Sequence, residues 1–319
     1  TTTLNFPVPL TAAGGSLTFA RFRISSQGGL SYTGSASDGE VEDYEVWIEP
    51  AAELKKDQYP DLDVTGIDVN ASEPYILADD FLCEEPGRID EIRVWGSWLN
   101  DYIPFNEDPY GVEFILSLHE DIPADESPTG FSMPGKLLWM KRFLPGEFSV
   151  EVYMDQIEEG WLDPPDFYIF PADWTCWLYT FPIPAEEHVY QVGTQDEPKV
   201  YWLDVQALPY DIDARFGWKT SLDHWNDDAV WGQGMEPYDG PWNELIYPPD
   251  HIMHPESIDL AFAIIGNPTA DVPDGETGRA FGLKQNVPNP FNPTTTIRYQ
   301  IPAGGAEIAI EIFDVAGRR

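Results

Sequence analysis

The stretch that decides the fold class is Ile89-Asp-Glu-Ile-Arg-Val-Trp95, a short run of apolar and β-branched residues preceded by Pro86-Gly87. Its length and its turn residues are typical of a β-strand. No long stretch keeps a helical period. Similar runs recur between turns rich in Pro and Gly, at residues 112–119, 136–142, 167–170, 200–205 and 257–265. The sequence therefore predicts an all-β fold, with a β-sandwich or jelly roll as its central domain.

Composition divides the chain into five parts. Residues 1–50 hold two predicted strands, 17–25 and 41–49, around a turn rich in Gly and Ser. Both end pieces are expected to be parts of domains, because strand patterns run up to the first and last residues. The family resemblances of the two pieces imply that they are partial immunoglobulin-like sandwiches. The remaining parts are a polar linker at 51–69, the central domain at 70–266, a second linker at 267–282 and the last piece at 283–319.

The chain is strongly acidic, with 17 Lys and Arg against 56 Asp and Glu and a formal net charge of −39. Binding to DNA or RNA needs a basic face, so nucleic acids are excluded as expected partners. A surface this acidic can keep a protein soluble in salty water, bind hard cations or hold neighbouring molecules apart by repulsion. No run of about 18 apolar residues predicts a membrane span.

The run Ser37-Asp-Gly-Glu-Val-Glu-Asp-Tyr-Glu-Val46 follows Ala20-Arg-Phe-Arg-Ile-Ser-Ser-Gln-Gly-Gly-Leu30. It closely resembles the end of the GEVED domain, an extracellular β-sandwich module of secreted bacterial proteins. The resemblance covers residues 1–50 and implies secretion to the extracellular space or the cell surface.

Four carboxylates lie close together near this turn. Like charges at such short distances repel one another unless a cation compensates them. Two arrangements remain open, cross-strand pairing with Arg21 and Arg23 or a bound Ca²⁺. The residues that would hold calcium are Asp38, Glu40, Glu42 and Asp43.

The segment Gln285-Asn-Val-Pro-Asn-Pro-Phe-Asn-Pro-Thr-Thr-Thr-Ile-Arg-Tyr-Gln-Ile-Pro302 is similar to the start of FlgD-type and type IX secretion C-terminal sorting domains. These domains have an immunoglobulin-like fold. The resemblance implies that the parent protein is exported by a secretion machinery and delivered to the cell surface.

The central domain resembles uncharacterised β-sandwiches of secreted bacterial proteins and, by its overall strand pattern, jelly-roll carbohydrate-binding modules. Eleven of the 12 tryptophans of the chain lie in it, and a sandwich core accommodates two or three. By strand alternation Trp95 and Trp202 are expected in the core. The ligand-binding candidates are four tryptophans in loop-like contexts, namely Trp98, Trp225, Trp231 and Trp242.

Catalytic motifs are sparse. No Gly-x-Ser-x-Gly elbow and no phosphate-binding loop are present. A polysaccharide hydrolase needs two carboxylates, and Asp227 and Asp228 lie among aromatic residues at 224–231. We therefore expect no enzyme, with these two residues counted among the ligand-binding candidates.

The two cysteines, Cys83 and Cys176, lie in hydrophobic strands. A disulfide between them and two buried free thiols are equally open. His251 and His254 have a spacing that suits a transition metal, but their proline-flanked loop favours a solvated role.

Three functions remain in view. The first is a non-catalytic structural or adhesive protein of the cell surface, such as a subunit of an appendage or layer that pairs through sheet edges. The second is a carbohydrate-binding module that holds a polysaccharide with loop tryptophans. The third is a polysaccharide-active hydrolase.

Overall fold

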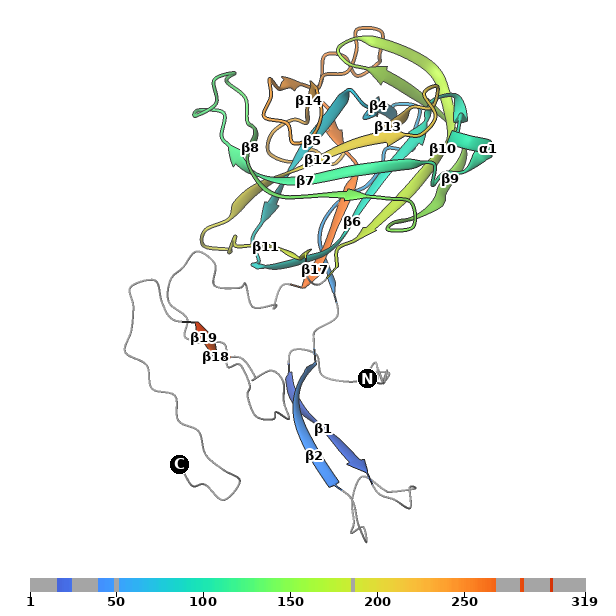
Figure 1. Cartoon of the computed structure of the whole chain (residues 1–319). Helices are drawn as coiled ribbons and strands as arrows, with labels where there is room; N and C mark the ends of the chain where they lie inside the picture. The colour runs from blue at the N-terminus through green and yellow to red at the C-terminus, as the bar shows by residue number, and fades with distance from the viewer. Residues whose placement is uncertain are drawn as a thin grey trace. The chain divides into compact units, whose positions relative to one another are not determined.

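The computed structural model describes residues 16–24, 40–48, 52–184, 187–267, 282–283 and 299–300 (Figure 1). Side chains are described within 52–184 and 187–267, apart from residues 106 and 107. The chain divides into two units, residues 1–270 and 271–319. In the second, β18 (Gly282–Leu283) pairs with β19 (Tyr299–Gln300).

In the first unit, β1 (Ser16–Ile24) and β2 (Glu40–Ile48) form an antiparallel pair close to the two strands expected there. Their register places Arg21 opposite Asp43. Asp38 lies outside the described residues, as do the side chains of Glu40, Glu42 and Asp43, so the calcium prediction falls outside the described part.

Two sheets pack face to face as a β-sandwich, which confirms the predicted all-β fold class (Figure 1). The six-stranded sheet has the order β15-β14-β5-β12-β7-β8. Its strands are β5 (Tyr75–Cys83), β7 (Val112–Ile122), β8 (Met133–Phe143), β12 (Lys199–Pro209), β14 (Val230–Gln233) and β15 (Asn243–Glu244).

The nine-stranded sheet has the order β16-β13-β4-β9-β10-β6-β17-β3, and β11 pairs with β6 beside it. Its strands are β3 (Glu53–Gln58), β4 (Ile67–Asn70), β6 (Gly87–Trp98), β9 (Ser149–Asp163), β10 (Phe167–Pro182), β11 (Val189–Gln191), β13 (Phe216–Ser221), β16 (Asp259–Leu260) and β17 (Phe262–Asn267). Two short helical turns, η1 (Leu99–Asp101) and α1 (Pro104–Glu107), follow β6. No helix in the described residues is long and apolar enough to cross a membrane.

Alternation along the strands decides which side chains enter the space between the sheets. On β7, Phe114, Leu116 and Leu118 face the main core, which aromatic residues such as Phe181 and Phe216 complete. Residues of the opposite parity on the same strands form two smaller clusters, one on the outer face of each sheet. The described residues of the domain therefore form three hydrophobic clusters rather than a single core.

The nine-stranded sheet also closes on itself. The second half of β6 pairs with β13, which pairs with β4, and β4 continues through β9 and β10 back to β6. We call these five strands the strand ring. At the seam between β6 and β13, a Cβ added to Gly96 would lie 2.1 Å from the carbonyl oxygen of Gly217. Glycine is therefore required there for the two backbones to approach.

The prediction that residues 51–69 form a linker is wrong. Within this segment β3 pairs with β17, and β4 is a strand of the ring. The residues of β3 are polar because β3 is an edge strand of the sheet. Asp68 on β4 is polar because it forms a buried ion pair with Lys219. Polar composition therefore concealed two strands.

The two cysteines are buried free thiols, so the disulfide alternative is wrong. Cys83 on β5 belongs to the core between the sheets, where its Sγ donates to the carbonyl oxygen of Glu85 at 3.2 Å. Cys176 on β10 belongs to the cluster on the outer face of the other sheet.

Candidate functional site

A groove with a volume of about 410 Å³ opens where several strands end. Asn70 ends β4, Asp163 ends β9 and Gln233 ends β14, while Tyr75 begins β5 and Arg215 precedes β13. We call this feature the strand-end groove. Its size falls in the range of small-molecule sites, and polar side chains in such a concave site fix the orientation of a ligand.

Asp163 is the best-held side chain of the groove. Its Oδ1 accepts hydrogen bonds from Asn70 Nδ2 at 2.7 Å and from Trp161 Nε1 at 2.9 Å. Its Oδ2 lies 3.2 Å from Nη1 of Arg215, whose side chain is 49% exposed against 15% for Asp163. The carboxylate is therefore fixed in position, while Arg215 reaches into solvent.

The ring of Tyr75 supplies an aromatic wall. Burial and the nearby Asp163 carboxylate raise the pKa of Tyr75, so its phenol stays neutral and can donate a hydrogen bond. The carbonyl oxygens of Tyr75 and Gly234 both accept from Nε2 of Gln206, at 3.2 and 3.0 Å. These bonds fix the two sides of the groove relative to each other.

Two other hollows have fewer side chains suited to binding a ligand. One of about 160 Å³ lies between β3 and β5, and one of about 370 Å³ lies between Tyr59, Asp61 and Asp223. Neither combines a carboxylate held by several side-chain donors with an aromatic wall, so the strand-end groove is the better candidate.

The predicted binding residues do not form one site. Trp98 is fully buried, and its Nε1 donates to the hydroxyl of Tyr179 at 3.1 Å. Trp242 is buried against Tyr238, with ring centroids 4.9 Å apart. The prediction that these two tryptophans present a free face to a ligand is wrong, because Trp98 belongs to the main core and Trp242 to the smaller cluster on the six-stranded sheet.

The other predicted residues are partly exposed. Trp231 lies beside the groove, its ring centroid 6.3 Å from that of Tyr75. Trp225, Asp227 and Asp228 share a loop at the end of β13. In that loop the Trp225 amide donates to Asp259 Oδ2 at 2.9 Å, and Asp227 Oδ2 accepts from Ser132 Oγ at 2.5 Å. Both bonds run to residues outside the loop, so they hold the loop against the rest of the domain.

The expected core tryptophans, Trp95 and Trp202, are indeed buried. Six tryptophans are buried in all among the described residues, namely Trp95, Trp98, Trp161, Trp202, Trp218 and Trp242. The expectation of two or three was therefore too low.

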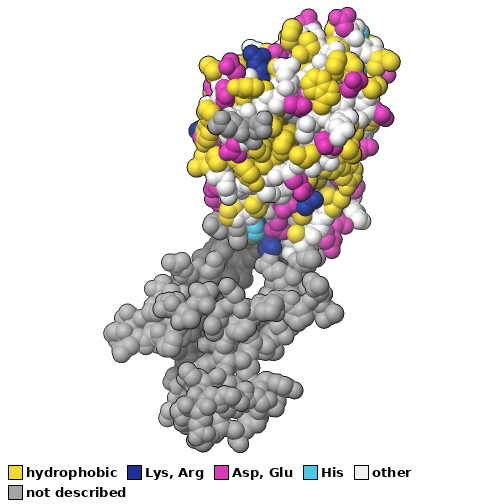
Figure 2. All heavy atoms as spheres, turned by 90° about the vertical axis from the view of Figure 1, so that its right-hand side faces the viewer, with side chains coloured by type: hydrophobic (Ala, Val, Ile, Leu, Met, Phe, Trp, Pro, Cys, Tyr) yellow, Lys and Arg dark blue, Asp and Glu magenta, His cyan; other side chains and the backbone are white. Residues whose placement is uncertain are grey.

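The tryptophan that is most exposed among the described ones, Trp174, was not among the predicted residues. It lies on β10 and is 40% exposed, beside the exposed Phe170 on the same strand. Figure 2 shows apolar side chains exposed among acidic ones on the side of the domain that carries β9, β10 and α1. The alternation of β10 would not have found it. Polar Asp173 and Thr175 flank Trp174, which predicts an inward-facing indole, whereas Asp173 is buried and Trp174 is exposed.

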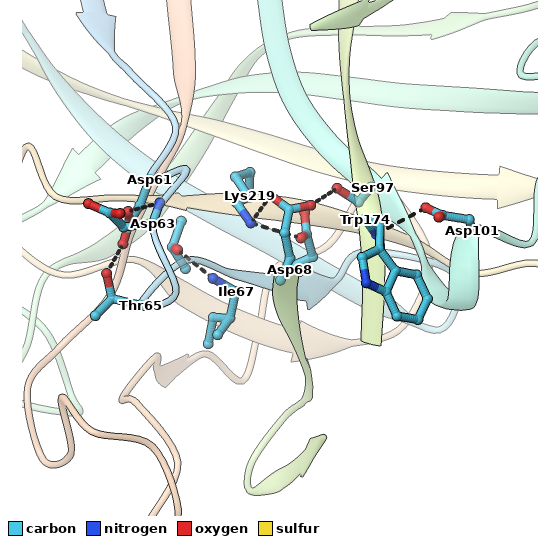
Figure 3. A network of polar contacts seen from close by, with 11 residues as sticks. Asp61, Asp63, Thr65, Ile67, Asp68, Ser97, Asp101, Trp174 and Lys219 are labelled. Atoms are coloured by element: carbon cyan, nitrogen blue, oxygen red, sulfur yellow. Dashed lines mark hydrogen bonds and ion pairs between the residues drawn. The ribbon is translucent and has the colours of Figure 1, made fainter. Parts of the chain in front are cut away.

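Each strand of the ring contributes one polar residue to a buried cluster. These residues are Asp68 of β4, Ser97 of β6, Glu159 of β9, Asp173 of β10 and Lys219 of β13, all fully buried. We call them the ring cluster. Figure 3 shows three of its members, Asp68, Ser97 and Lys219, in their network of polar contacts. Lys219 Nζ lies 3.2 Å from Asp68 Oδ2 and also contacts Glu159 Oε1, and Ser97 Oγ donates to Glu159 Oε2 at 2.8 Å.

Burial shapes the protonation of the ring cluster. It raises the pKa of Asp173 to about 11 and that of Asp68 to about 8. Asp173 is therefore a neutral acid at pH 7. Lys219 is the cation that compensates the remaining negative charge of the cluster. The cluster is closed to solvent, which is typical of a structural ion pair rather than a binding site.

Comparison with known proteins identifies the domain. Residues 54–265 match the model of a family described as a domain of unknown function (DUF7901). No curated protein and no solved structure matches the chain. The matched range begins within β3 and ends within β17, so it covers nearly the whole sandwich. This chain belongs to the DUF7901 family.

Proposed function

We propose that this chain is a non-catalytic, adhesive binding module of an extracellular protein, and that its strand-end groove holds a sugar unit of a polysaccharide. The observation that carries the proposal is the fixed Asp163 carboxylate beside the ring of Tyr75 in an open groove.

The chemistry of the groove suits a sugar. A pyranose presents hydroxyl groups around its edge and C–H groups on its faces. Planar groups such as the Asp163 carboxylate, the Gln233 amide and the Arg215 guanidinium bind neighbouring hydroxyls. An aromatic ring such as Tyr75 packs against a C–H face.

The charge of the molecule narrows the class of polysaccharide. With a net charge of −39, the chain repels polymers of uronic acids or sulfated sugars at low salt. We therefore expect neutral polysaccharides as ligands. The extracellular setting, with delivery to the cell surface, is supported by the resemblances of residues 1–50 and 285–302.

The test is a titration of the protein with neutral oligosaccharides selected on a glycan array. Tyr75→Ala and Asp163→Asn are expected to weaken binding by about tenfold or more, equivalent to about 1.4 kcal/mol. The matched control is Trp225→Ala with Asp227→Asn on the 223–228 loop, which should bind as the wild type does.

Two results would contradict the proposal. Glycan binding that survives in both groove variants but is lost in the loop variant would transfer the site to the loop. Absence of binding to any neutral glycan at millimolar concentration would remove the sugar function itself.

A further inference from the structure

A second buried polar cluster lies on the outer face of the six-stranded sheet. His119 on β7 and Asp204 on β12 point to this face, since Asp204 lies opposite Ser117 in the register. Glu236 follows β14 in the segment that covers the sheet. His119 and Asp204 are almost fully buried, and Glu236 is part-exposed with its Oε1 buried.

The hydrogen bonds of His119 determine where its proton lies. Its Nδ1 is 3.0 Å from the carbonyl oxygen of Gly135. A carbonyl only accepts, so Nδ1 carries the hydrogen, and burial lowers the pKa of His119, which favours the neutral ring. Nε2 then presents a lone pair, 3.3 Å from Asp204 Oδ2 and 3.1 Å from Ser117 Oγ. A histidine held at Nδ1 by a backbone carbonyl, with Nε2 unprotonated, is oriented as metal-binding histidines are.

Three of the four carboxylate oxygens around this lone pair lack a hydrogen-bond donor, the fourth being Glu236 Oε2, which accepts from the amide of Tyr238. Both oxygens of Asp204 and Oε1 of Glu236 are buried without a hydrogen-bond partner. One ligand atom from each of His119, Asp204 and Glu236 lies within 4.8 Å of the others. Two buried carboxylates facing a lone pair are strongly unfavourable unless a cation or a proton lies between them.

The described surroundings supply no cation. The outside charge that acts on both His119 and Glu236 is the carboxylate of Asp239. In the ring cluster, by contrast, Lys219 pairs with two of the three buried acids, Asp68 and Glu159. The two clusters have a similar number of acidic groups, but one of them contains its own cation and the other does not.

We propose that His119 Nε2 and the carboxylates of Asp204 and Glu236 bind a divalent transition-metal ion of the Zn²⁺ or Mn²⁺ class. Imidazole nitrogen suits these ions, whereas Ca²⁺ takes oxygen ligands. The ion joins β7 and β12 to the segment that follows β14. The part-exposed Glu236 provides its route from solvent.

The experiment measures binding of Zn²⁺, Mn²⁺ and Ca²⁺ by calorimetry to the chelator-treated protein, together with the melting temperature. The wild type is expected to bind one Zn²⁺ or Mn²⁺ more tightly than Ca²⁺ and to melt at a higher temperature with the ion. Asp204→Asn and Glu236→Gln should each weaken binding by more than about tenfold, because each removes a ligand.

The matched control is Asp239→Asn, which removes a nearby charge without removing a ligand and should bind the ion nearly as the wild type does. Without metal, both ligand variants should melt no lower than the wild type, since each replaces a buried carboxylate by a neutral amide. Absence of saturable binding in the wild type, unchanged binding in both ligand variants, or tighter binding of Ca²⁺ than of Zn²⁺ and Mn²⁺ would overturn the proposal.

Discussion

Lys219 carries a positive charge into the interior of the strand ring, where its exposure is zero. Removing one partner of a buried ion pair leaves the other charge without compensation, which costs about 3–5 kcal/mol. We predict that Lys219→Met lowers the free energy of unfolding by an amount in that range, measured by urea denaturation. Lys199→Met, on the exposed start of β12, is the matched control and should change little.

The double variant Lys219→Met with Glu159→Gln refines this prediction. Glu159 would otherwise remain charged and unpaired, so its neutral replacement should restore part of the lost stability. A single variant as stable as the wild type would show that Lys219 does not compensate the ring cluster.

Asp80 on β5 links stability to pH. Burial raises its pKa from 3.8 to about 8, despite the hydrogen bond that it accepts from Asn226. Between these two values the folded state holds a proton that the unfolded state has released. Stability therefore falls as pH rises from about 4 to about 8, by about 1.4 kcal/mol per pH unit for each such proton.

The replacement Asp80→Asn keeps the shape and removes the titration. We predict a shallower fall in the urea-unfolding free energy between pH 5 and pH 8 than in the wild type. The control Glu151→Gln changes an exposed carboxylate on β9. Equal pH slopes in the wild type and Asp80→Asn would refute the assigned protonation.

At the scale of the element, the edges of the two sheets carry much of the positive charge. Edge strand β3 holds Lys55 and Lys56, and edge strand β8 holds Lys136, Lys141 and Arg142. Like charges on an edge discourage two copies from pairing along it. On β3 the two lysines stand beside Glu53 and Asp57, so charge of a single sign is confined to β8, and we expect that edge to resist self-association.

This arrangement leads to a prediction about assembly. Residues 52–267 should sediment as a monomer, whereas the triple variant Lys136→Thr, Lys141→Thr and Arg142→Thr should form concentration-dependent oligomers. Exposed apolar residues of β8, Leu138 and Met140, would then meet across the edge. Oligomers of the unmodified domain that dissociate on mutation of β8 would contradict this account.

The strand elements were predictable because their apolar runs are local. The run 89–95 lies inside β6, and 200–205 lies inside β12. The last part of β6 was missed because Gly96 and Ser97 interrupt the apolar pattern, yet they form the seam and the interior of the strand ring. Gly96 is small because β13 approaches it from more than a hundred residues away, and Ser97 is polar because it donates to Glu159, 62 residues away.

The candidate site was not predictable in the same way. The residues of the groove come from three separate parts of the sequence, 70–75, 163 and 215–233, and meet because five strand ends converge. None of them has a distinctive local pattern. The predicted residues Asp227 and Asp228 stood out because tryptophans surround them, but this loop bonds mainly to its own domain.

At the scale of the whole molecule, the boundary of the folding unit is decisive. We predict that residues 52–267 unfold cooperatively on their own, while residues 70–266 do not form a stable fold. The shorter fragment lacks β3 and the part of β4 that carries Asp68, so the strand ring opens and Lys219 loses a partner. Differential scanning calorimetry of both fragments provides the comparison, and similar cooperative transitions would contradict the boundary.

The central claim is that the strand-end groove binds a neutral sugar. A crystal structure of residues 52–267 with a neutral oligosaccharide that binds on the glycan array tests it most directly. We predict a sugar ring packed on Tyr75, with hydroxyl groups bonded to Asp163 and Gln233. A sugar bound at another surface, with the groove filled by water, would contradict the claim.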